Sequence, residues 1–136
     1  MRQKSIGIVV SKFNEEITSQ MLASAKQEAK ALKLKISEIV FVSGAFEIPF
    51  ATKQLLAKKE ITAVATLGAV IKGGTGHDQV IAHAVAKKIL DLSLELNKPV
   101  SLGIIGPNAT LSQAKERAVP YAQRAVQAVL GMMMEK

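Results

Sequence analysis

Four short apolar runs recur along the chain, and each is followed by a longer segment whose apolar residues return at helical spacing. The runs are rich in β-branched residues and cover residues 5–10, 38–42, 63–68 and 100–105. Continuous apolar runs of this length are typical of strands that a parallel sheet buries on both faces. The alternation predicts the α/β fold class: a single-domain, flavodoxin-like, three-layer α/β/α sandwich around a four-stranded parallel sheet.

Capping signals place the predicted helices between these runs. Asn14, followed by two glutamates, is a favourable N-cap for the first helix, and Pro49 suits the first turn of the second. Residues 75–78 and 110–113 both have the spacing of a capping box, with an aspartate in place of the usual glutamate in the first. Pro120 falls inside the pattern of the last helix, where we expect a kink or a local break.

Composition narrows the classes of protein and site that remain. The 136 residues are enough for one domain with a substantial core, and we treat residues 1–136 as that domain. The chain has no cysteine and only two histidines, His77 and His83, so we exclude disulfides and thiolate chemistry and expect no metal site. No apolar stretch approaches the ~20 residues that a membrane span needs, and the first run is too short for a signal peptide. We therefore expect a cytoplasmic protein with no membrane partner.

The chain is basic, with eighteen Lys and Arg against eleven Asp and Glu and a net charge of +7. Such a balance favours an anionic ligand, either a small substrate or a nucleic acid. The charges are spread along the chain, and its five aromatic residues are few for a base-stacking surface. We therefore expect no nucleic-acid partner, although charge alone does not decide the question.

The segment after the third run, residues 68–78 (GAVIKGGTGHD), is the most informative part of the sequence. Ligands of open parallel sheets bind beyond the carboxyl ends of the strands, and this segment joins such an end to a predicted helix. Its glycines leave the backbone free to approach a ligand, and the free N–H groups of the helix start attract an anion. His77 is placed to move protons. A glycine-rich turn with a surface histidine fits the spacing equally well, so both interpretations stay open.

Three further positions have both a functional and an ordinary interpretation. Glu47, after the second run, is placed either to accept hydrogen bonds from substrate hydroxyls or simply to favour a helix start. Phe13, after the first run, offers either a stacking face for a planar ring or an apolar contact before the N-cap. Arg117, in the last helix, either binds a phosphate or is exposed to solvent.

Four motifs, in this order, resemble the lumazine synthase family over nearly the whole chain: SKFNEEIT (11–18), SGAFEIPFA (43–51), GAVIKGGTGHD (68–78) and LSQAKERA (111–118). The resemblance implies an enzyme, a transferase of riboflavin biosynthesis. Its expected reaction condenses 5-amino-6-(D-ribitylamino)uracil with 3,4-dihydroxy-2-butanone 4-phosphate to 6,7-dimethyl-8-ribityllumazine, with release of phosphate and water. The resemblance implies no metal and no organic cofactor.

The resemblance also implies roles for individual residues. His77 matches the family's proton-transferring histidine. The positions that match contacts to the pyrimidine and its ribityl chain are Phe13, Ala45, Phe46, Glu47, Val70, Ile71 and Leu102. Those that match the phosphate-binding group are Gly74, Thr75 and Arg117. Because sites of this family lie between adjacent subunits of a homopentamer, we expect Leu102 and Arg117 to reach the site of a neighbouring subunit.

Three positions depart from the family's usual pattern. His77 is followed directly by Asp78, where many members have an aromatic residue in between, and the role of Asp78 stays open. Leu102 stands where an aromatic residue is common. The lysine that tends to follow the matched arginine is absent, and Arg124 is the first basic residue after Arg117. Either Arg124 supplies the charge that helps to hold the phosphate, or this charge is missing.

Two other functions remain as alternatives. An archaeal-type riboflavin synthase resembles the lumazine synthase fold, but the intact GAFEIP and GGTGHD segments argue against it. A basic module that binds nucleic acid without catalysis is disfavoured by the spread of charge and the small number of aromatic residues. The sequence does not determine whether pentamers stay single, pair or close into a shell.

Overall fold

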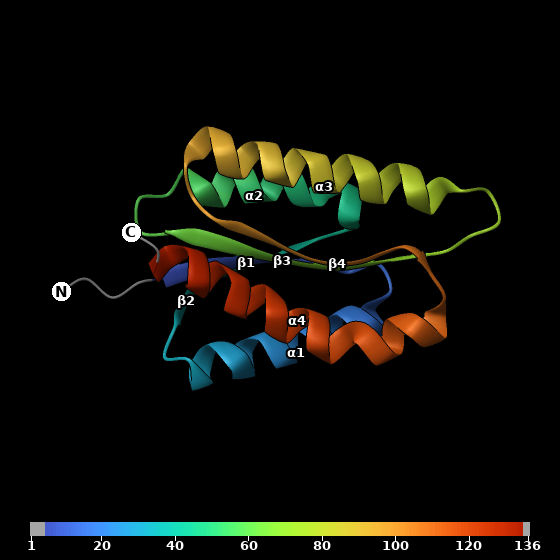
Figure 1. Ribbon diagram of the computed structural model, residues 1–136, viewed down its shortest axis with the longest axis horizontal. Helices are drawn as coiled ribbons and strands as arrows, with labels where there is room; N and C mark the ends of the chain where they lie inside the picture. The colour runs from blue at the N-terminus through green and yellow to red at the C-terminus, as the bar shows by residue number, and fades with distance from the viewer. Residues whose placement is uncertain (1–4, 135–136) are drawn as a thin grey trace.

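The computed structural model describes residues 5–134, in which four strands form one parallel sheet in the order β2-β1-β3-β4 (Figure 1). The strands are β1 (Ser5–Ser11), β2 (Lys35–Val42), β3 (Ala63–Ile71) and β4 (Val100–Ala109). The helices are α1 (Glu15–Ala31), the short 3-10 turn η1 (Ala45–Glu47), α2 (Ile48–Leu56), α3 (His77–Leu96) and α4 (Leu111–Met134). The flavodoxin-like α/β topology that the alternating pattern predicts is confirmed.

Helices cover both faces of the sheet, with α1 and α4 on one side and α2 and α3 on the other (Figure 1). Every residue of β1 is buried, as expected for a central strand between two helical layers. Successive side chains of a strand point to opposite faces, so β1 contributes to both cores. Ile6 and Ile8 pack on the side of α1 and α4, whereas Val9 packs with α2 and α3.

The ends of β3 and β4 extend beyond their apolar runs and shape one edge of the sheet. β3 continues to Ile71, which pairs with Ala109 at the end of β4. The register shifts just before this pair, so that Val70 and residues 106–108 stand outside the regular ladder. An irregularity of this kind bends a strand and changes the direction of its backbone groups. It lies at the carboxyl ends of the strands, where the sequence predicts a ligand.

The side-chain caps predicted at the starts of α1 and α3 do not form. Asn14 precedes α1 with a left-handed backbone (φ 64°), and its side chain makes no capping bond. Its Nδ2 group instead donates to the carbonyl oxygen of Ala69 at 3.0 Å. α3 begins at His77, directly after Gly76, and no side chain caps it, so the capping box over residues 75–78 does not form. In both places the predicted capping residue bonds to a partner distant in the sequence: Asn14 to Ala69, and Asp78 to the N–H of Asn108.

The other helix signals give a mixed result. The capping box at the start of α4 is confirmed, because Thr110 and Gln113 exchange hydrogen bonds of 3.0 and 3.1 Å. Pro49 lies in the first turn of α2, as predicted. Of the two alternatives expected at Pro120, a kink or a local break, the break does not occur, since α4 continues through this residue. Within residues 5–134, no helix is both long and apolar enough to cross a bilayer.

We predict that Gly106→Ala destabilises the protein by about 2 kcal/mol or more. Gly106 has a φ of 112°, and a Cβ atom at this position would lie 2.4 Å from the carbonyl oxygen of Val70. Urea unfolding at equal protein concentration measures the difference. The matched control is Gly131→Ala, where a Cβ atom meets nothing within 4 Å and a helix gains up to about 1 kcal/mol. Wild-type stability of Gly106→Ala would contradict the expected clash.

Candidate active site

A cleft of about 410 Å³ opens at the carboxyl ends of β1, β2 and β3. Its walls come from the loop after β1, the segment around η1, the end of β3 and the start of α3. The lining residues are Phe13, Gly44, Ala45, Phe46, Glu47, Ala69, Val70, Ile71, Gly73, His77, Asp78 and Ile81. Parallel pairing therefore brings three of the four sequence motifs to one place, as expected for this fold class.

Backbone hydrogen bonds hold the loop that carries Phe13 between the ends of two strands. The N–H of Phe13 donates to the carbonyl oxygen of Ser43 at 2.9 Å, which joins this loop to the end of β2. The next residue, Asn14, bonds to Ala69 near the end of β3. Phe13 remains 71% exposed. A flat apolar face is thus fixed at the mouth of the cleft, where a planar ligand can stack on it.

The η1 segment forms the second wall. Ala45 is buried, whereas Phe46 and Glu47 are exposed. The Oε1 atom of Glu47 accepts the N–H of Gly44 at 2.9 Å, so part of this carboxylate serves the local turn. A carboxylate has about four acceptor positions, so Glu47 keeps capacity for hydroxyl groups of a ligand. Both interpretations of Glu47 from the sequence are therefore compatible with its place in the cleft.

The end of β3 and the start of α3 form the third wall. Val70 stands outside the regular ladder, and beyond it the N–H of Lys72 donates to the carbonyl oxygen of Ala109 at 2.7 Å. The chain then passes through the glycine-rich turn to His77, the first residue of α3, whose side chain is exposed. This wall offers irregular strand backbone and an imidazole that can exchange protons with a ligand in the cleft.

Asp78 is the one buried charged group of the cleft. Its side chain is 4% exposed, and its Oδ2 atom accepts the N–H of Asn108 at 2.8 Å. That hydrogen bond is the main cause that lowers the pKa of Asp78, with smaller effects from the backbone groups of Gly73, Asp78 itself and Gln79. The carboxylate thus stays ionised and links α3 to the end of β4.

The structure divides the residues that the sequence singled out. Seven of them line the cleft: Phe13, Ala45, Phe46, Glu47, Val70, Ile71 and His77. Gly74 and Thr75 are exposed in the turn beside it and do not line it. Leu102 and Arg117 lie on β4 and α4, away from the cleft of the same chain, and Leu102 instead lines a separate hollow with Tyr121 and Arg124.

Sequence reasoning missed Ile81, an apolar residue of α3 that no residue pattern distinguishes from ordinary core. Gly73 belongs to the glycine-rich segment whose backbone the sequence predicts to approach a ligand, and it lines the cleft. Gly44 and Ala69 lie in two of the sequence motifs, but neither was expected as an individual contact. The sequence presents Asp78 as the acid of a capping box and as a departure from a family pattern, and assigns it no role in the site. Among the described residues, no group of three or more His, Asp or Glu is placed to hold a metal ion.

We predict that Asp78→Asn lowers the free energy of unfolding at neutral pH. In acid, the free energies of unfolding of the variant and of wild type should become more alike. Folding lowers the pKa of Asp78, so its ionised form stabilises the fold above the usual pKa of 3.8. This stabilisation is lost as the pH falls through the lower pKa of the folded state. Urea unfolding at a series of pH values from about 7 to about 3 measures the change.

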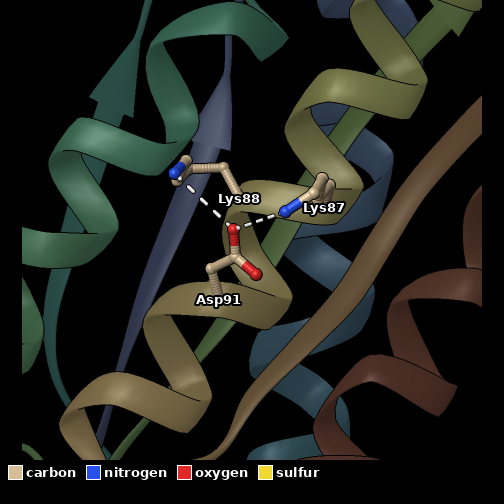
Figure 2. Close-up of polar contacts among 3 residues, drawn as sticks. All are labelled: Lys87, Lys88 and Asp91. Carbon is tan, nitrogen blue, oxygen red and sulfur yellow. Dashed lines mark hydrogen bonds and ion pairs between the residues drawn. The ribbon is translucent and has the colours of Figure 1, made fainter.

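The matched control is Asp91→Asn on the same helix. Asp91 accepts a hydrogen bond from Lys87 at 3.0 Å and lies 3.6 Å from the Nζ atom of Lys88, and both lysines are largely exposed (Figure 2). Exposed ion pairs contribute little to stability, so this substitution should have the smaller effect. If Asp78→Asn lowers the free energy of unfolding by the same amount at every pH, the charge of Asp78 does not stabilise the fold.

Comparison with known proteins identifies the family of this chain. The model of the 6,7-dimethyl-8-ribityllumazine synthase family matches residues 3–136. The 6,7-dimethyl-8-ribityllumazine synthase of Metallosphaera sedula is 55% identical over 127 residues, which cover 93% of this chain and 84% of the relative. The corresponding protein of Pyrobaculum arsenaticum is 49% identical over 131 residues (96% and 87%). That of Saccharolobus solfataricus is 51% identical over 135 residues (98% and 88%).

Among solved structures, a GDP-L-fucose synthetase from Naegleria fowleri aligns with 97% of this chain and 44% of its own, at 18% identity and a TM-score of 0.44. That similarity is too low to inform fold or function. The family assignment depends instead on the sequence relatives and on the family model, which spans nearly the whole chain. The chain belongs to the 6,7-dimethyl-8-ribityllumazine synthase family.

Proposed function

We propose that this chain is the transferase that forms 6,7-dimethyl-8-ribityllumazine in riboflavin biosynthesis, and that the cleft at the ends of β1, β2 and β3 is its active site. The substrates are 5-amino-6-(D-ribitylamino)uracil and 3,4-dihydroxy-2-butanone 4-phosphate, and phosphate and water are released. One observation carries the proposal. In a chain of this family, an exposed ring, a carboxylate and an imidazole from three separate motifs line one cleft: Phe13, Glu47 and His77.

The first substrate fits the two walls nearest β1 and β2. The pyrimidine stacks on the exposed ring of Phe13, which backbone hydrogen bonds hold at the mouth of the cleft. The ribityl hydroxyls donate to the carboxylate of Glu47. The backbone of Val70 and Ile71 contacts the edge of the ring, and the irregular register at Val70 leaves polar groups there outside the ladder. Holding two substrates in one cleft removes much of the entropic barrier to condensation.

His77 transfers protons during the reaction. The amine of the pyrimidine attacks the ketone, and loss of water gives an imine. Phosphate is then eliminated, and the ribitylamino nitrogen attacks the remaining carbonyl carbon, whose oxygen leaves as a second water when the ring closes. Each of these steps requires a proton to leave one atom and reach another. An imidazole in the first turn of α3, exposed and lining the cleft, is suited to both directions of transfer.

The phosphate lies at the glycine-rich turn, beside Gly74 and Thr75. The turn is open, since a Cβ atom at Gly74 would meet nothing within 4 Å. The cation that completes this subsite comes from another subunit. Arg117 lies on α4, and α4 covers the face of the sheet opposite α3 (Figure 1). The net charge of +7 favours a phosphorylated substrate at longer range.

The working form is a homo-oligomer built from pentamers, with each site between two adjacent subunits. Large apolar side chains stand exposed: Phe13 and Phe46 line the cleft and are 71% and 67% exposed, and Phe50, on the neighbouring helix α2, is 69% exposed. On β4, which is an edge strand of the sheet, Leu102 is 51% exposed. Apolar surface of this kind marks interaction sites. A neighbour that presents Leu102 and Arg117 covers such surface and completes the site.

We predict that wild-type protein forms the lumazine from both substrates and that His77→Ala lowers kcat by about 100-fold or more. KM for each substrate should change less than about threefold, because the imidazole acts in the transition state rather than in binding. Product fluorescence measures the rate. His83→Ala is the matched control, an exposed histidine of the same helix outside the cleft, and it should keep wild-type activity. Unchanged kcat in His77→Ala would exclude it as the proton carrier.

We predict that Arg117→Ala raises KM for the phosphate substrate and that mixing with His77→Ala restores activity. In mixed assemblies, the cleft of an Arg117→Ala chain keeps its histidine and receives Arg117 from a His77→Ala neighbour. Equal amounts, refolded together and assayed at low substrate, should give about a quarter of the wild-type sites.

The control for the mixing experiment is Lys115→Ala, which removes a cation from the same helix. Lys115 pairs with Glu16 at 3.1 Å on the surface, so its loss should leave activity unchanged with or without mixing. If the mixture of His77→Ala and Arg117→Ala is no more active than the two proteins assayed apart, the site is not shared between subunits.

A further inference from the structure

Asp78 stands where the glycine-rich turn, the start of α3 and the end of β4 meet. It is the second residue of α3, next to His77, and its carboxylate accepts the N–H of Asn108 at the end of β4. Its side chain is 4% exposed although it lines the cleft. A buried charge at this place needs a reason, because burial without partners disfavours the ionised form.

The irregular end of β4 explains why a buried acceptor is needed. Asn108 has a left-handed backbone (φ 66°) and stands outside the register that pairs β3 with β4. Its N–H therefore has no ladder partner, and a backbone donor left without an acceptor is costly. The carboxylate of Asp78 supplies that acceptor at 2.8 Å. The bond spans 30 residues and fixes the first turn of α3 against the end of the sheet.

The same carboxylate also faces the glycine-rich turn. Backbone groups of Gly73 and Gln79 add to the lowering of the pKa of Asp78, so turn and helix both direct polar groups toward it. A Cβ atom added at Gly73, Gly74 or Gly76 would meet nothing within 4 Å, so the turn is open on these sides, and the Asp78 carboxylate is one group that links it to the start of α3.

We propose that Asp78 is a positioning residue of the reaction: its carboxylate holds the start of α3 against the end of β4 and thereby sets the place of the His77 imidazole in the cleft. The inference deepens the proposed function and rests on it, since it concerns the proton transfers assigned to His77. A displacement of about 1 Å at a reacting group can lower a rate by about 100-fold, so a residue that fixes His77 affects kcat without touching substrate.

The first test compares kinetic constants. Asp78→Ala lowers kcat by about tenfold or more, while KM for both substrates changes less than about threefold. Asp78→Asn keeps an oxygen that accepts the Asn108 N–H, so it recovers most of the loss. Asp91→Ala, which removes an acid from the other end of the same helix, is the matched control and keeps wild-type kcat. In the His77→Ala background, Asp78→Ala has no further effect, since it acts through the imidazole.

The second test does not depend on activity. Hydrogen exchange of the peptide that contains Asn108 becomes faster in Asp78→Ala than in wild type, and Asp78→Asn stays close to wild type. Wild-type kcat in a folded Asp78→Ala protein, or an undiminished effect in the His77→Ala background, would overturn the proposal. If Asp78→Ala does not fold, Asp78→Asn decides: a tenfold loss of kcat with protected Asn108 would show that the hydrogen bond does not position the histidine.

Failure of the proposed function gives a different result. Wild-type protein that forms no lumazine overturns that function, and the catalytic consequence of Asp78 with it. Exchange at Asn108 still reports whether the carboxylate holds the end of β4.

Discussion

The parallel pairing of three neighbouring strands is the constraint on which the rest of the site depends. β1 pairs with β2 on one side and with β3 on the other, so the loops that leave these strands emerge at the same edge. Hydrogen bonds then join those loops to one another, from Phe13 to Ser43 and from Asn14 to Ala69. The backbone fixes the positions of the cleft walls, and exposed side chains such as the Phe13 ring remain free to meet ligands.

The negative charge at the start of α3 follows from a second constraint. At the irregular end of β4, the N–H of Asn108 needs an acceptor, and the carboxylate of Asp78 supplies it. The N-terminus of a helix attracts an anion, and in this chain the carboxylate of Asp78 already lies there. A substrate phosphate bound where we propose would therefore meet a helix start that is partly neutralised from within. This explains why the proposed phosphate subsite uses the open turn at Gly74 and Thr75 and draws its cation from elsewhere. The carboxylate of Asp78 therefore stabilises the end of β4 and, at the same place, weakens the attraction of the helix start for a phosphate.

The sequence predicts most of the fold and part of the site, and the boundary between them has a physical basis. Buried parallel strands leave continuous apolar runs, so layers and strand count can be read from pattern alone. Caps fail where a side chain finds a distant partner: Asn14 bonds to Ala69, and Asp78 to Asn108. Residue spacing contains no information on contacts across 55 or 30 residues. For the same reason, nothing in the sequence indicates that Ile81 lines the cleft.

The predicted site residues lie in two separate regions of the chain. This separation makes a complete site dependent on the assembly of subunits. Within one chain, His77 lines the cleft, but Arg117 and Leu102 lie on α4 and the edge strand β4. If a neighbour supplies them, the competent site exists only in the oligomer, and its population follows protein concentration by mass action. The exposed phenylalanines then stabilise the assembly in the same contacts that complete the site. Affinity between subunits and affinity for the phosphorylated substrate become linked, so each must strengthen the other by the same factor.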